Sequence, residues 1–70
     1  MARNVGDVVK WNWGDGTGTG EITKVYTQNT TVTIKGTEVT RDASDECPAY
    51  LIEQNDGDEV LKSESEVSAA

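Results

Sequence analysis

The chain has 70 residues, a formal net charge of −7, one cysteine and no histidine. This length permits one small domain, which buries only about 60% of the surface that its unfolded chain exposes. The single cysteine, Cys47, excludes an internal disulfide, and the lack of histidine excludes Cys/His zinc sites and Ser–His or Cys–His catalytic pairs. We therefore expect no enzyme activity, no cofactor and no metal site.

The charge is unevenly distributed along the chain. Residues 1–41 carry five basic and four acidic side chains, whereas residues 42–70 carry one basic and nine acidic ones. Such a surface repels nucleic acid and anionic lipid at long range, so we expect neither as a partner. No apolar run is long enough for a membrane span or a signal peptide, and we expect a soluble, cytoplasmic protein. The acidity either keeps a small domain soluble or favours a basic partner.

We expect residues 1–4 to be flexible. After them, apolar and polar residues alternate with a period of two, which is the pattern of a β-strand. In residues 8–13 the alternation places Val9, Trp11 and Trp13 on one face, as a half-buried strand requires. Residues 20–26 predict a second strand, and Gly20 at its start permits a bulge or a close approach of another backbone.

The segment between these strands, within "WNWGDGTGTGEI", holds four glycines that alternate with Asp and Thr. Dinucleotide-binding and Walker motifs do not fit, because the glycine spacing and the required lysine are missing and a strand follows. A calcium loop would have only Asp15 and Glu21 as acidic ligands, which predicts weak affinity at best. We interpret residues 14–19 as a mobile loop whose glycines adopt positive φ.

The middle of the chain predicts a hairpin. Residues 30–36 predict a third strand with Val32 and Ile34 inward and Lys35 outward, and residues 37–41 continue it or pair with it across a short turn. Nine threonines fall between positions 17 and 40, and so many β-branched residues favour strands over helices.

The last third of the chain predicts two more strands and two short helical turns. Residues 49–54 and 59–62 are the strands, joined by a turn in which Gly57 takes positive φ. Small and acidic residues at 42–47, before Pro48, predict a helical or 3₁₀ turn, and S-x-x-E capping spacing predicts another at 63–67. We expect residues 68–70 to be a disordered tail.

These elements predict an all-β fold in which five short strands form an antiparallel barrel within a single domain of residues 5–67. Four aromatic residues are available to fill this barrel or line its rim. Trp13 stands out because it lies at a strand end beside a glycine-rich segment and Asp15. A rim of Trp13, Asp15, Tyr26 and Tyr50 would attract a cationic ligand by cation–π contact and charge pairing. The alternative is that Trp13 only packs over apolar rim residues.

A second hypothesis makes the protein a nucleic-acid-associated accessory factor. It would use a basic strip on the first three strands, formed by Lys10, Lys24, Lys35 and Arg41. The net charge opposes this hypothesis. We favour a monomeric interaction module that binds a cationic peptide or protein, and dimerisation through the rim remains an alternative.

Several short stretches together resemble the hypervirulence-associated protein Tudor domain family. They are "VGDVVKW", "GTGTGEITKVY", "KGTEVTRDASDECPAYLIEQNDGDEVLK" and the closing "SEV", and they span roughly residues 5–67. The resemblance implies a Tudor-like, SH3-type barrel, and eukaryotic Tudor domains bind methylated Arg or Lys side chains. The sequence departs from the family pattern in two places: only Lys62 ends the last strand, without the usual histidine, and Trp13 stands where polar residues are usual.

Overall fold

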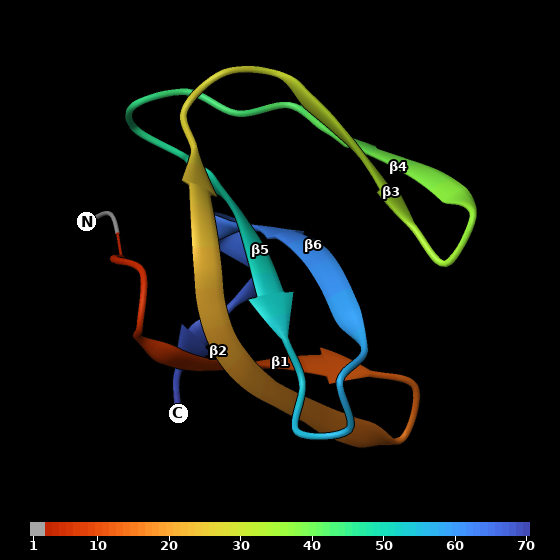
Figure 1. Ribbon diagram of the computed structural model, residues 1–70. Helices are drawn as coiled ribbons and strands as arrows, with labels where there is room; N and C mark the ends of the chain where they lie inside the picture. The colour runs from red at the N-terminus through yellow and green to blue at the C-terminus, as the bar shows by residue number, and fades with distance from the viewer. Residues whose placement is uncertain (1–2) are drawn as a thin grey trace.

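The computed structural model describes residues 3–70 and shows an all-β chain (Figure 1). A five-stranded antiparallel sheet has the order β6-β5-β2-β1-β7, and β3 and β4 form a separate hairpin. In chain order the elements are β1 (Val8–Trp13), β2 (Gly16–Tyr26), β3 (Thr30–Ile34), β4 (Thr37–Arg41), β5 (Ala49–Glu53), β6 (Glu59–Ser63), the 3₁₀ turn η1 (Glu64–Glu66) and β7 (Ser68–Ala69).

The core lies on one face of the five-stranded sheet. Its buried side chains are Val9, Trp11, Ile22, Tyr50, Ile52 and Val67. The alternation along β1 turns Val9 and Trp11 inward as predicted. Trp13 belongs to the same face, yet it lies beyond the core with 63% of its surface exposed.

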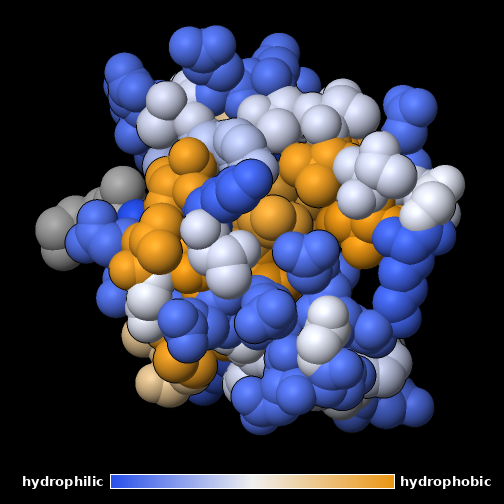
Figure 2. All heavy atoms as spheres, viewed as in Figure 1, coloured by the Kyte–Doolittle hydropathy of each residue, from blue (hydrophilic) through white to orange (hydrophobic). Residues whose placement is uncertain are grey.

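The hairpin β3–β4 covers part of the opposite face. Leu51 and Leu61 pair across β5 and β6 and are buried there, and Ile34 and Val39 of the hairpin lie over β6. In Figure 2, apolar atoms gather across the middle of the molecule, and polar atoms lie over part of them. The strand β5 is therefore buried on both faces, which explains its continuous apolar sequence.

The predicted closed barrel of five strands is not confirmed. Among residues 3–70, no backbone ladder joins the hairpin to the five-stranded sheet. Ion pairs connect the hairpin to the segments on either side of β6, Lys35 to Asp58 before the strand and Arg41 to Glu66 after it. The hairpin is thus held against β6 by side chains, so the sheet stays open at that edge.

Two further predictions differ from the structure. Residues 42–47 form a bent loop without a helical turn, because Ser44 bonds with its hydroxyl and its N–H to the backbone of Cys47 and closes a local turn. Residues 68–70 are not a free tail, since Ser68 and Ala69 pair with β1 and cover its outer edge.

The predicted turn at residues 63–67 is confirmed as η1, where the Ser63 N–H donates to Glu66 Oε1 at 2.9 Å. Of the expected flexible N-terminus, residues 1–2 lie outside the described residues, and the Arg3 N–H donates to the Tyr50 hydroxyl at 2.8 Å.

Candidate functional site

Two glycines of β2, which have no side chains, lie next to the two tryptophan rings of β1. Gly16 and Gly18 lie opposite Trp13 and Trp11 in the antiparallel register. A methyl group added at Gly18 would lie 2.6 Å from the Trp11 ring, whereas one at Gly16 would lie 3.9 Å from the Trp13 ring. The prediction of a mobile loop at residues 14–19 is therefore wrong: these glycines make room for aromatic side chains inside a strand.

The predicted close approach at Gly20 is confirmed, because an added methyl group there would lie 2.6 Å from the Glu53 carbonyl oxygen. The connection between β1 and β2 is a two-residue turn of Gly14 and Asp15. Of these two residues, only Gly14 has a positive φ, at 50°, and a positive φ at the first central position is the pattern of a type II′ turn. This tight turn holds Trp13 at the tip of a long hairpin.

A groove of about 290 Å³ lies between the tip of this hairpin and the β5–β6 turn. We call it the Trp13 groove. Its lining residues are Trp13, Thr17, Gly18, Thr19, Gln54, Asn55 and Asp56. The groove thus offers one largely exposed indole, hydroxyl and amide groups and one carboxylate, and none of its lining residues is basic.

The structure does not bring the four predicted rim residues together. Trp13 and Asp15 lie at the β1–β2 turn, while Tyr26 ends β2 ten residues after Gly16, about 30 Å farther along an extended strand. Tyr50 pairs with Val25 near that far end and is completely buried. Only Trp13 and Asp15 share one end of the sheet.

Tyr50 has a structural role instead. Its hydroxyl donates to Glu64 Oε2 at 2.7 Å and accepts the Arg3 N–H at 2.8 Å. Burial and the neighbouring Glu64 carboxylate raise the pKa of the Tyr50 phenol above its ordinary value. This side chain therefore links the N-terminus, β5 and η1 beneath the surface.

Sequence reasoning missed the residues from the β5–β6 turn. Gln54, Asn55 and Asp56 follow the end of β5, and the predicted turn at "NDGD" had no assigned role in the site. Their nearness to Trp13 depends on how far each hairpin extends past the sheet. The carboxylate density of this turn was the available signal.

The predicted basic strip is interrupted by ion pairs. Lys35 Nζ lies 2.7 Å from Asp58 Oδ1, a hydrogen-bonded pairing that raises the pKa of Lys35, and Arg41 Nε lies 3.1 Å from Glu66 Oε1. Lys10 and Lys24 are exposed, but Lys10 pairs with Thr19, five positions before Lys24 along β2. The four side chains therefore do not form one continuous basic surface.

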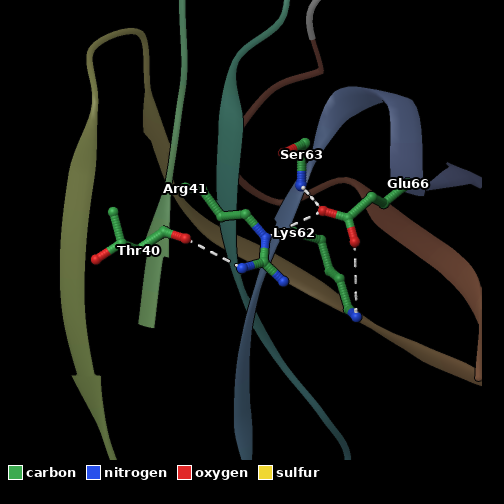
Figure 3. A network of polar contacts seen from close by, with 5 residues as sticks. All are labelled: Thr40, Arg41, Lys62, Ser63 and Glu66. Carbon is green, nitrogen blue, oxygen red and sulfur yellow. Dashed lines mark hydrogen bonds and ion pairs between the residues drawn. The ribbon is translucent and has the colours of Figure 1, made fainter. Parts of the chain in front are cut away.

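Glu66 is the centre of a polar cluster that ties the hairpin to β6 (Figure 3). Its carboxylate accepts from the Ser63 N–H and from Arg41 Nε, and its Oε2 lies 3.9 Å from Lys62 Nζ. Burial would raise the pKa of Glu66, but the Ser63 amide and the charges of Arg41 and Lys62 outweigh this effect and lower it. All of these groups are engaged with one another, so we assign the cluster to stability.

Over residues 3–70, the structure shows no group of three or more Cys, Asp or Glu side chains placed to hold a metal ion. In the same residues, no helix has the length and apolar character needed to cross a membrane.

A family model described as the hypervirulence associated proteins TUDOR domain matches residues 6–67. The chain belongs to this family. Comparison of this chain with the curated proteins and with the solved structures found no match. Membership in this Tudor family agrees with the all-β antiparallel fold and indicates a binding module in general. A small Tudor-like β domain is generally non-catalytic, and Tudor domains generally bind proteins or peptides.

Proposed function

We propose that this Tudor-family domain binds a cationic side chain of a partner peptide or protein in the Trp13 groove. The observation that carries the proposal is the exposure of Trp13, 63% of whose surface is accessible beside a groove lined by a carboxylate and no base. A guanidinium or methylated ammonium group is attracted to an indole face and gains further when a carboxylate lies nearby.

The contacts of Trp13 support this function over simple packing. A methyl group added at Gly16 would lie 3.9 Å from the Trp13 ring, an ordinary contact distance, so the ring is not pressed tightly against the strand beneath it. The core cluster is complete without Trp13. The side chain therefore contributes little apolar burial to folding, and its large exposed surface is available to a ligand.

Two acidic side chains lie close to this indole along the chain or in space. Asp56 lines the groove itself, and Asp15 stands in the turn two residues after Trp13. The amides of Gln54 and Asn55 add hydrogen-bond acceptors of the kind that a guanidinium group uses. We therefore expect arginine, methylated arginine and methylated lysine as ligands.

The test is a titration of ¹⁵N-labelled protein with short peptides that carry dimethylarginine or trimethyllysine, followed by backbone and indole NMR signals. We expect the Trp13 indole signal and the amides of residues 54–56 to shift together and saturate. Trp13→Ala should weaken binding about 2- to 30-fold, since a cation–π contact contributes about 0.5–2 kcal/mol.

A matched control is Val8→Ala, which truncates another exposed apolar side chain of β1, away from the groove. This variant should bind as the parent does. Equal affinity of the parent and the Trp13→Ala variant for these peptides would contradict the proposal.

A further inference from the structure

The strand β2 extends past its neighbour β5. It pairs with β1 from Gly16 to Glu21, but its pairing with β5 begins only at Glu21. Residues 16–20 therefore have a strand on one side only. Figure 1 shows this overhang at the lower edge of the view, near the β5–β6 turn.

The register identifies which backbone groups of the overhang are free. The Ile22 N–H donates to the Asp7 carbonyl, and hydrogen-bonded pairs alternate along an antiparallel ladder. Gly20, Gly18 and Gly16 therefore bond to β1, while the N–H and C=O groups of the two residues between them point away. These two residues are Thr17 and Thr19.

No described strand meets the outward backbone groups of Thr17 and Thr19, and both residues are exposed. The next residue with the same orientation, Glu21, pairs with Glu53 of β5. Proteins usually protect such an edge with lysine, proline or a bulge. The overhang has none of these, since the irregularity in β2 falls later, between Ile22 and Lys24.

This open edge is part of the Trp13 groove. Thr17, Gly18 and Thr19 of the overhang line it together with Trp13 and Asp56. A strand added to β2 would lie about 4.8 Å from it and would fill the groove lengthwise. Alternate side chains of that strand would then share the groove with the indole and the carboxylate.

We propose that the partner binds as an extended segment that adds a strand to the edge of β2 at Thr17–Thr19, with a cationic side chain against Trp13 and Asp56. This inference rests on the proposed function and names its binding mode. Backbone hydrogen bonds supply affinity in strand addition, and alternate side chains supply specificity.

The charge of the groove and of the chain indicates which kind of segment binds there. The groove contains one carboxylate and no base, and the whole chain carries a net charge of −7. A second copy of this chain would bring like charge to the groove. The occupant is therefore a foreign peptide with arginine or lysine at alternate positions.

Amide hydrogen exchange tests this mode directly. The probe is acetylated and amidated Val-Arg-Val-Arg-Val, added to the ¹⁵N-labelled chain at about nine times its Kd. Exchange of the Thr17 and Thr19 amides should slow about tenfold, because only free protein exchanges. The Asn12 amide lies on the other edge of β1, past the last residue that pairs with β7, so it is the internal control and should change little.

A second measurement uses the parent protein with N-methylated versions of the probe. Methylation of alternate peptide nitrogens should weaken binding by tenfold or more at one set of positions and little at the other set, as expected for a strand with one paired edge. Thr19→Pro, which removes an outward N–H, should weaken binding in the same way, and Thr19→Val should not.

The results separate the two proposals. A shifted Trp13 indole with unchanged exchange at Thr17 and Thr19 would overturn strand addition and leave the cation site standing. Slower exchange at these amides without an indole shift, and equally with an uncharged Val-Gln-Val-Gln-Val probe, would support strand addition and overturn the cation site. Slower exchange that depends on protein concentration without any probe would overturn the assignment to a foreign peptide.

Discussion

The substitution Gly18→Ala tests whether the glycines of β2 are there to accommodate aromatic rings. The added methyl group would lie 2.6 Å from the Trp11 ring, about 1 Å closer than ordinary van der Waals contact. Trp11 is 5% exposed and belongs to the core cluster, so its ring has little room to move. Overpacking of this kind costs about 1–3 kcal/mol.

For a domain of this size, each kcal/mol shifts the melting temperature by roughly 4–8 °C. We therefore expect Gly18→Ala to lower Tm by at least about 4 °C in thermal unfolding followed by circular dichroism. Gly16→Ala is the matched control, since its methyl group would lie at an ordinary 3.9 Å from the Trp13 ring. It should leave Tm nearly unchanged or raise it slightly, because alanine restricts the unfolded chain. Equal destabilisation by the two substitutions would refute the reasoning.

Two more predictions concern the polar contacts. The pKa of Glu66 is lowered in the folded state, so its stabilising contribution is present above the ordinary carboxyl pKa and is lost as the pH falls through the lowered value. Urea midpoints measured from pH 7 down to about pH 3 should therefore fall less steeply for Glu66→Gln than for the parent, and parallel curves would contradict this. Tyr50→Phe should lower the unfolding free energy by about 1–2 kcal/mol at neutral pH, because Glu64 and the Arg3 N–H lose a partner that is largely buried. Since the pKa of Tyr50 is raised in the folded state, the stabilisation that its phenol supplies should be complete below about pH 10 and should decline at higher pH. Urea midpoints of the parent and the variant, measured from neutral pH up to about pH 11, test both statements.

The strands could be predicted from the sequence because their signals are local. Alternation of Val9 and Trp11 identified β1 and its inward face, and Gly57, which has a φ of 88°, marked the turn between β5 and β6. The capping spacing of Ser63 and Glu66 likewise identified η1. Each of these features depends on residues within a few positions of one another.

The glycine segment was misinterpreted for a physical reason. Glycine is favoured in loops, so four glycines in seven positions indicated mobility. The better signal was the match between two period-two patterns, Trp11 and Trp13 on one strand and Gly16 and Gly18 on the next, separated by a two-residue turn. Such a match indicates that each aromatic ring packs over a glycine of the neighbouring strand, but it can be interpreted only once the register of the hairpin is known.

The candidate site was only half predictable. Trp13 and Asp15 are neighbours in sequence and stayed together, whereas Tyr26 and Tyr50 lie at the far end of the sheet. Whether Trp13 would be buried depended on where β5 ends, and β5 ends at Glu53, before it reaches the hairpin tip. Strand lengths are set by tertiary packing, which local patterns do not contain.

The most direct test of the central claim is the affinity of the Trp13 groove for a charged side chain against its neutral isostere. Two peptides that differ only in arginine versus citrulline would be titrated into the protein and followed at the Trp13 indole N–H signal. The account predicts a saturable shift with the arginine peptide and binding weaker by about tenfold with citrulline, since the charge supplies both the cation–π contact and the pairing with Asp56. Equal shifts and equal affinities would contradict a cation site.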